Sequence, residues 1–200
     1  MKIGIMGGTL DPVHNGHVQL ARAALDLLGL DRVMLLPAGD PPHKSPPSQK
    51  ADRMQMVRLA ARSAPGLFAC GIEIARTGTT YTVDTLRELA RVNPHTQWYY
   101  LIGADTLDAL ESWRDFPEVA RMCVFAVSAR AEGDVNRARA RDLERRCGAR
   151  FVLLPFRGPE ISSSDIRLRV AEGRSIAGMT PPEVEAYIRG EGLYLSLIHI

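Results

Sequence analysis

The chain has 200 residues, of which 46% are hydrophobic and 24% are charged, and its formal net charge is +2. This composition is typical of a globular protein, and the charge is too small to indicate a nucleic-acid partner. No apolar run approaches the roughly 20 residues that span a membrane, and no signal-peptide pattern precedes the first strand, so we expect a cytoplasmic protein without a membrane partner.

The predicted elements alternate between strands and helices along the whole chain. The first half is expected to contain a strand at 3–6, a helix at 16–28, a strand at 32–36, a proline-rich loop at 37–48, a helix at 49–63 and a strand at 68–74. The second half is expected to contain a helix at 82–92, a strand at 98–102 with its exit turn at 103–105, a strand at 122–127, a helix at 134–147, a strand at 151–154, and helices at 162–172 and 182–189. The alternation predicts right-handed βαβ units and therefore an α/β fold, a Rossmann-like, doubly wound and mostly parallel sheet with helices on both faces.

The segment 7–17, GGTLDPVHNGH, joins the first predicted strand to the first predicted helix. In an open α/β sheet ligands bind at such junctions, because glycines such as Gly7 and Gly8 let the backbone approach a phosphate and the helix start offers unpaired N–H groups. His14 and His17 are three residues apart and can therefore lie on one face of the first turn. We predict a phosphate site here; the competing interpretation is a helix cap with two surface histidines.

A second polar segment, ISSSDIR at 161–167, lies near the end of the chain. Its serines can cap a helix, which is the structural interpretation. Arg167 follows Ser164 by three residues, so its guanidinium can turn toward the same end of that helix. Hydroxyls, free N–H groups and a guanidinium together are typical of a polyphosphate site.

A metal site formed by protein side chains is not expected. The two histidines have neither the glutamate of an H-E-x-x-H motif nor a third ligand at a recognisable spacing. The three cysteines, Cys70, Cys123 and Cys147, are far apart and never form a C-x-x-C pair, so reduced thiols are expected.

The two polar segments together resemble the nucleotidyltransferase superfamily that carries H-x-G-H and I-S-S-[ST]-x-[IVL]-R motifs. Within it, the chain is similar to the bacterial nicotinate-nucleotide adenylyltransferases from Met1 to about Tyr194. Further matches are PPHK at 41–44, TYTVDTL at 80–86, IGAD at 102–105 and Trp113. The pattern therefore implies a single domain over 1–194, and 195–200 look like a foreign tail.

The resemblance implies transfer of the adenylyl group of ATP to nicotinate mononucleotide, which gives deamido-NAD and pyrophosphate and needs Mg²⁺. The catalytic residues that it implies are His14, His17 and Arg167. The implied ATP site comprises Gly7, Gly8, Thr9, His14, Gly16, His17, Lys44, Gly103, Asp105, Arg130, Ser162, Ser163, Ser164 and Arg167. The implied nicotinate mononucleotide site comprises Gly8, Lys44, Tyr81, Thr82 and Trp113.

The neighbouring residues in the sequence bear on the assignments of Trp113 and Arg130. Trp113 stands among polar residues, which favours stacking on the pyridine ring over a place in the core. Arg130 is followed by Ala131 and Glu132, where the family usually has proline and glycine.

Other functions stay open at this point. A related adenylyltransferase could use nicotinamide mononucleotide or phosphopantetheine instead, and a homo-oligomer is compatible with the sequence. A dinucleotide-binding dehydrogenase is disfavoured, because the first junction lacks G-x-G-x-x-G in register. A non-catalytic nucleotide sensor would be expected to lack His14, His17 or Arg167, and all three are present. The arginine-rich helix at 134–147 contains interleaved acidic residues, so we expect a solvated face and no nucleic acid.

Overall fold

The computed structural model describes residues 1–42, 46–128 and 133–195, with the backbone alone described at 133–136. Lys44, Arg130 and the tail residues 196–200 lie outside this part of the chain. The strands are β1 Lys2–Gly8, β2 Arg32–Pro37, β3 Leu67–Ala69, β4 Gln97–Gly103, β5 Cys123–Ser128 and β6 Phe151–Leu154. The helices are α1 Asn15–Leu28, α2 Lys50–Arg62, α3 Thr82–Val92, α4 Ala104–Ala109, the 3-10 helix η1 Leu110–Ser112, α5 Phe116–Met122, α6 Gly133–Cys147, α7 Ser163–Ala171 and α8 Pro182–Gly190.

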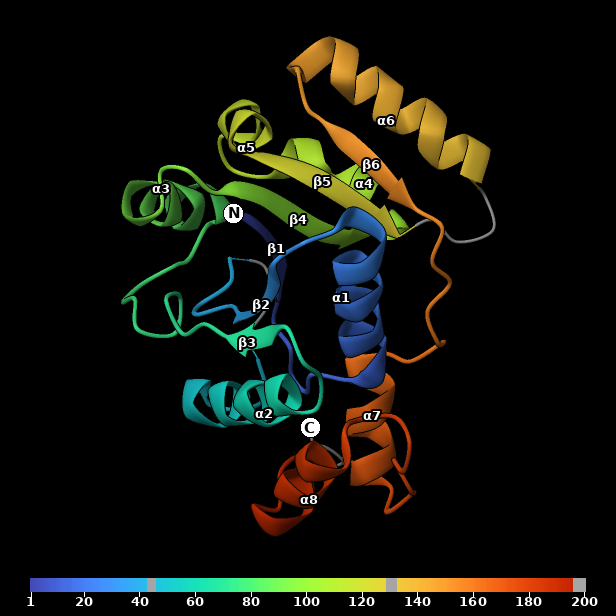
Figure 1. The fold of residues 1–200 in the computed structure, drawn as a ribbon. Coiled ribbons are helices and arrows are strands. Elements are labelled where there is room, and N and C mark those ends of the chain that lie inside the picture. The colour runs from blue at the N-terminus through green and yellow to red at the C-terminus, as the bar shows by residue number, and fades with distance from the viewer. Residues whose placement is uncertain (43–45, 129–132, 196–200) are drawn as a thin grey trace.

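The six strands form one sheet in the order β3-β2-β1-β4-β5-β6, and every pairing between them is parallel (Figure 1). The strand order reverses between β1 and β4, so the carboxyl ends of these two strands diverge into loops on opposite sides. This switch point is where open α/β sheets bind ligands. The predicted doubly wound, Rossmann-like fold is confirmed.

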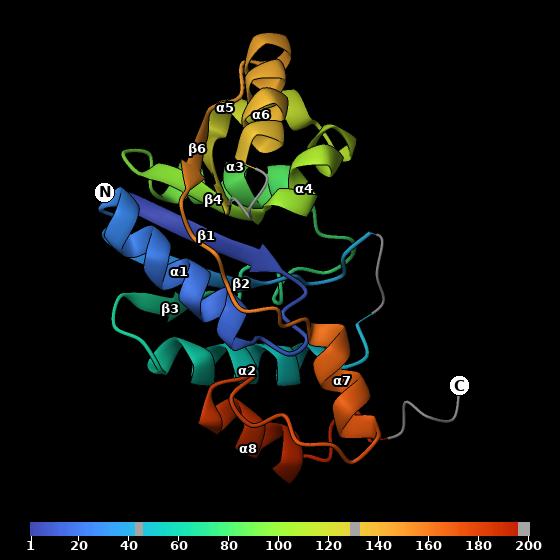
Figure 2. The same ribbon diagram turned by 90° about the vertical axis from the view of Figure 1, so that its right-hand side faces the viewer.

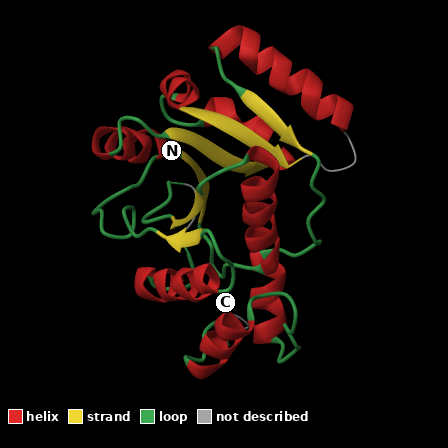
Figure 3. Cartoon of the chain, in the orientation of Figure 1, coloured by secondary structure: helices red, strands yellow, loops and turns green. Residues whose placement is uncertain are grey.

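Helices cover both faces of the sheet, as Figure 3 shows. One buried cluster joins α1, α2, α7 and α8 to one face, with Val18, Met56, Ile166 and Val184 among its members. The other joins α3, α4, α5 and α6 to the opposite face through residues such as Leu86. Because both faces are buried, the central strands are apolar throughout: Ile3 to Met6 of β1 form a continuous buried run with one glycine.

Helix α1 follows its sequence signals closely. Its buried side chains, among them Val18 and Ala24, recur at helical spacing and face the sheet. The helix ends at Gly29, which has φ 58°, and its N–H donates to the Leu25 carbonyl. Because α1 is packed on the sheet in this way, its amino end, which carries both histidines, lies near the carboxyl end of β1.

Two predicted segments differ from the structure. The strand expected at 68–74 ends at Ala69, which pairs with Leu35; after it the chain turns, with the Ala75 N–H donating to the Gly71 carbonyl. The exit turn expected at 103–105 is the start of α4. Helices α4 and α5 were not predicted, since both are too short to show a clear helical period.

The C-terminal helices return to the first half of the molecule. Figure 2 shows α7 beside the start of α1 and α8 beneath α2. The backbone N–H of Asn15 donates to the Met179 carbonyl at 2.8 Å, and the Tyr187 hydroxyl donates to Asp52 at 2.9 Å. In the described residues, no helix is both long and apolar enough to cross a membrane.

Candidate active site

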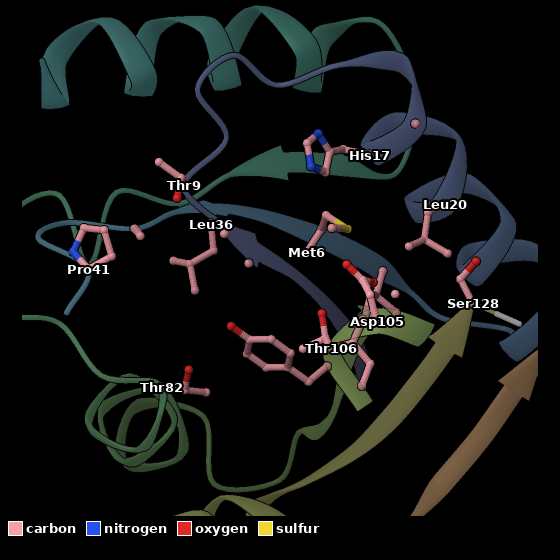
Figure 4. A pocket seen from close by; sticks show the side chains of 18 of the residues that line it. Met6, Thr9, His17, Leu20, Leu36, Pro41, Thr82, Asp105, Thr106 and Ser128 are labelled. Atoms are coloured by element: carbon pink, nitrogen blue, oxygen red, sulfur yellow. The ribbon is translucent and has the colours of Figure 1, made fainter. Parts of the chain in front are cut away.

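A cleft of about 820 Å³ opens at the carboxyl ends of β1 and β4. In Figure 4, Thr9 and His17 lie on one side of it, and Thr82, Asp105 and Thr106 lie at the starts of two helices that face it. The predicted site residues that line the cleft are Gly7, Gly8, Thr9, His14, Gly16, His17, Tyr81, Thr82, Gly103, Asp105 and Trp113. The histidine segment and the predicted nicotinate-site residues Tyr81, Thr82 and Trp113 therefore meet in one cavity.

The two histidines are stacked on each other at the start of α1. Their ring centroids are 3.6 Å apart, and the backbone N–H of His14 donates to Nδ1 of His17 at 3.2 Å. Because Nδ1 of His17 accepts a hydrogen bond, a neutral His17 ring carries its proton on Nε2. His17 can thus donate a hydrogen bond from Nε2 without bearing a charge, and the interpretation as two surface histidines is wrong for the buried His14.

Burial controls the charge of both rings. Desolvation lowers the pKa of His14 to about 4. Desolvation also lowers the pKa of His17 well below its ordinary value, and the neighbouring His14 lowers it further. Both imidazoles are therefore neutral at pH 7, and an arriving polyanion would raise both pKa values.

The low pKa of His14 makes the protein sensitive to acid. An unfolded histidine with a pKa near 6.5 binds protons that the folded His14 excludes, so stability is lost as the pH falls from 6.5 toward 4. We expect His14→Gln to remove this contribution, and the wild type to lose about 2 kcal/mol more than the variant between pH 7 and pH 5. Urea unfolding at the two pH values measures this; equal losses in both proteins would contradict it.

Glycines at the junction make room for side chains as well as for a ligand. A Cβ at Gly16 would lie 3.0 Å from the ring of His14, so the glycine of H-x-G-H lets that ring lie over the helix start. A Cβ at Gly7 would overlap the Tyr100 hydroxyl and lie 3.0 Å from Cζ of that ring. Contact with Tyr100, in addition to approach of a phosphate, therefore requires glycine at position 7.

We expect Gly7→Ala to lower the free energy of unfolding by about 1–3 kcal/mol, because the new methyl group forces Tyr100 to move. Tyr100→Phe removes the overlapping oxygen, so it should restore part of the loss in the Gly7→Ala background. A double-mutant cycle measured by urea unfolding tests the contact. Strictly additive effects of the two substitutions would show that the two residues do not interact.

The start of α7 docks on the turn that leads into the histidines. Arg167 Nη1 donates to the Asp11 carbonyl at 2.6 Å, and the Ser163 hydroxyl donates to the Pro12 carbonyl at 2.9 Å. Ser162 caps the helix by accepting the Asp165 N–H at 3.1 Å. This start of α7 adjoins the cleft through Ile161, which lines it. Four predicted site residues are not part of the cleft wall: Ser162, Ser163, Ser164 and Arg167.

The opposite end of the cleft is aromatic. Trp113 meets Tyr100 edge to face at 5.4 Å and Phe125 at 6.3 Å, and the Arg114 guanidinium lies 4.6 Å from the Tyr81 ring centroid. Trp113 is half-buried, so one edge joins the core while the residue also lines the cleft. Beside it, Thr82 opens α3, and its backbone stands at the helix end that attracts anions.

The sequence profile of the Cytidylyltransferase-like family matches residues 5–169. The chain belongs to this family. A Synechococcus sp. (strain JA-3-3Ab) protein named "Probable nicotinate-nucleotide adenylyltransferase" is 40% identical over 196 residues, which cover 97% of this chain and 95% of the relative. A Pelobacter propionicus protein of the same name is 36% identical and covers 97% of this chain and 98% of its own length.

Solved structures share the fold of this cytidylyltransferase-like chain. The Plasmodium falciparum nicotinic acid mononucleotide adenylyltransferase complexed with NaAD has a TM-score of 0.83, at 18% identity and 99% coverage of both chains. The same protein complexed with APC has a TM-score of 0.80. At this identity, the match establishes the architecture alone.

Two buried charged residues near the cleft were not predicted from the sequence. Glu73 is 6% exposed, lines the cleft and accepts the Thr85 hydroxyl at 2.7 Å. Arg53 is 1% exposed, and its guanidinium donates to the carbonyls of Thr9, Ala38 and Gly39. Their partners lie between 12 and 44 residues away in the sequence, and the strand predicted at 68–74 included Glu73, which the structure places in a turn.

The wall formed by 156–161 was also missed. Phe156, Gly158, Pro159 and Ile161 line the cleft on the side of α1. Ser128 at the end of β5 donates to the Phe156 carbonyl at 3.2 Å and so fixes the entry into this segment. An irregular segment of this kind has no period from which sequence reasoning could place it.

The side chains that line the cleft offer few ligands for a metal ion. Across 1–42, 46–128 and 133–195, no three His, Cys, Asp or Glu side chains are grouped so as to hold a metal. The cleft is nevertheless lined by two carboxylates, those of Glu73 and Asp105. Mg²⁺ usually keeps several waters and binds through one or two carboxylates and phosphate oxygens, which matches this donor set.

Proposed function

We propose that this protein is a nicotinate-nucleotide adenylyltransferase: it transfers the adenylyl group of ATP to the phosphate of nicotinate mononucleotide and releases pyrophosphate. The observation that carries the proposal is the docking of Arg167 and Ser163 on the turn before His14, at the edge of a cleft on the switch point of the sheet. The names of the full-length relatives support the choice of substrates.

The reaction suits a site without a nucleophilic side chain. The attacking group is the phosphate of the mononucleotide, which is an anion at pH 7 and needs no general base. Catalysis then consists of positioning two nucleotides and neutralising charge on the α-phosphate and on the departing pyrophosphate. The serines at 162–164 accordingly serve as hydrogen-bond donors and caps, and not as acyl-enzyme nucleophiles.

We assign the triphosphate to the end of the cleft between α1 and α7. His17 donates from Nε2 to a phosphate oxygen, and His14 holds His17 in that orientation through its backbone N–H. The start of α7 contributes its positive dipole end, and Arg167 its guanidinium, to the leaving phosphates. Gly7, Gly8, Thr9 and Gly16 provide the backbone surface beneath the phosphates, and Gly103 and Asp105 face the adenosine.

The nicotinate end of the same cleft is assigned to the aromatic wall. Trp113 offers a flat face to the pyridine ring, Tyr81 closes the wall, and the start of α3 at Thr82 presents backbone N–H groups to the carboxylate. Lys44 and Arg130 are assigned to the phosphates from the family pattern, and both lie outside the described residues.

Mg²⁺ enters the proposal as a partner of ATP. When bound, it would neutralise phosphate oxygens and orient the leaving pyrophosphate. Its ligands would be phosphate oxygens and water, since Asp105 is assigned to the adenosine. We further propose a cytoplasmic protein that acts on free nucleotides and not on nucleic acid, either alone or as a homo-oligomer.

An acceptor comparison tests the proposed function. ATP and Mg²⁺ are supplied with nicotinate mononucleotide, nicotinamide mononucleotide or phosphopantetheine, and pyrophosphate release is measured. We expect the highest kcat/KM with nicotinate mononucleotide, because the helix start at Thr82 favours a carboxylate over a neutral amide. Faster release with phosphopantetheine, or release with none of the three, would contradict the proposal.

A further inference from the structure

A buried polar cluster lies beneath the turn that carries the histidines. Asp11, Ser48 and Tyr194 are 1%, 9% and 7% exposed, although they are far apart in sequence. The Tyr194 hydroxyl donates to Asp11 Oδ1 at 2.5 Å, and the Ser48 hydroxyl donates to the same oxygen. The Ser48 N–H donates to Asp11 Oδ2 at 3.1 Å, so this buried carboxylate accepts three hydrogen bonds.

The same turn is held from its other side by its main chain. The carbonyls of Asp11 and Pro12 accept hydrogen bonds from Arg167 and Ser163, as described above. Asn15, which directly follows His14, makes two hydrogen bonds to the connection between α7 and α8. Its backbone N–H donates to the Met179 carbonyl, and its side-chain amide donates to the Gly178 carbonyl. The position of His14 is therefore set by contacts from the second half of the chain.

Tyr194 is suited to anchor this turn. It follows α8, and its ring is buried in the core that includes Met56. The Tyr194 hydroxyl oxygen lies 3.8 Å from the Met56 sulfur. Burial raises the pKa of the Tyr194 hydroxyl, and the Asp11 carboxylate raises it further, so the phenol keeps its proton and remains a donor. Tyr194 is not part of the cleft wall, so it would act through Asp11 and not on a substrate.

We propose that Tyr194 is a positioning residue for the adenylyl transfer: its hydrogen bond to Asp11 fixes the turn 11–14 and, through it, the stacked rings of His14 and His17. The inference rests on the proposed function for its kinetic consequence, but not for its structural one. It makes the segment after α8 a determinant of activity, although that segment lies outside the cleft.

The test compares two tyrosines at the C-terminal end. Tyr194→Phe removes the anchoring hydroxyl, while Tyr187→Phe removes a hydroxyl that donates to Asp52 at 2.9 Å on the surface of α2 and leaves the turn untouched. We expect kcat to fall about tenfold in Tyr194→Phe, with the KM for nicotinate mononucleotide unchanged, because misplaced phosphate donors slow the chemical step. Tyr187→Phe should keep wild-type kcat.

A second readout does not depend on substrates. The imidazole ¹H–¹⁵N signals of His14 and His17, recorded in the free protein, should shift in Tyr194→Phe and remain in place in Tyr187→Phe. Ser48→Ala removes a side-chain donor from the same carboxylate without altering the aromatic core, so it should shift the same signals. It replaces Tyr194→Phe in this test if that variant does not fold.

The two readouts separate failure of this inference from failure of the proposed function. An inactive wild type would contradict the proposed function, while the imidazole signals would still test the anchor. Unshifted imidazole signals, or wild-type kcat in folded Tyr194→Phe, would overturn the inference. An equal loss of kcat in Tyr187→Phe would also overturn it, because the effect would then belong to the C-terminal segment in general.

Discussion

His17→Ala is expected to lower kcat by roughly 10²–10³ while the protein stays folded. The Nε2–H of the neutral ring is a donor aimed at charge that develops on the phosphates, and such donors typically contribute this much. The ring is held by the His14 N–H at 3.2 Å, so its orientation is fixed before the substrate arrives. Steady-state kinetics with ATP and nicotinate mononucleotide, together with circular dichroism, measures both parts of the expectation.

A matched control is available in His95, an exposed histidine after α3 and away from the cleft. His95→Ala removes an imidazole of the same kind and should keep wild-type kcat. If folded His17→Ala turned over at the wild-type rate, the assignment of His17 to the phosphates would be wrong.

Arg53→Met is expected to lower the free energy of unfolding by about 3–5 kcal/mol. Its guanidinium donates to three carbonyls that belong to two different loops, Thr9 after β1 and Ala38 with Gly39 after β2. Methionine fills a similar volume but leaves these acceptors without a donor, and each unsatisfied buried acceptor costs about 1–3 kcal/mol. Urea unfolding at pH 7 measures the loss.

The control for this substitution lies on the same helix. Arg58 is exposed on α2, so Arg58→Met should change stability by less than about 0.5 kcal/mol. Arg53→Lys should recover only part of the loss, since an ammonium lacks the planar fork that reaches both loops. A loss in Arg53→Met no larger than that in Arg58→Met would contradict the role given to the buried guanidinium.

Local signals predicted the parts of the fold that depend on short stretches of sequence. Gly29 marks the end of α1 and Ser162 caps α7, both through contacts within a few residues, and the alternation of strand and helix segments indicates the parallel sheet. The same holds for the histidine pair, because its stacking needs only one helical turn. Because both partners of such a contact are close in sequence, the local pattern of residues predicts the contact.

The contacts that hold the candidate site in place could not be predicted in this way. Tyr194 is 183 residues from Asp11, and Arg53 is 44 residues from Thr9, so no periodicity connects the partners. Glu73 was assigned to the strand predicted at 68–74, yet that strand ends at Ala69 and the chain turns. These residues are polar and buried, and only the folded chain shows which partners satisfy them.

The central claim is that two distant segments, the turn before α1 and the start of α7, form one cradle for a triphosphate. A crystal structure of the protein with a non-hydrolysable ATP analogue and Mg²⁺ tests it most directly. The account predicts phosphate oxygens within hydrogen-bond distance of both His17 Nε2 and the start of α7 with Arg167. A triphosphate bound away from either segment would contradict it.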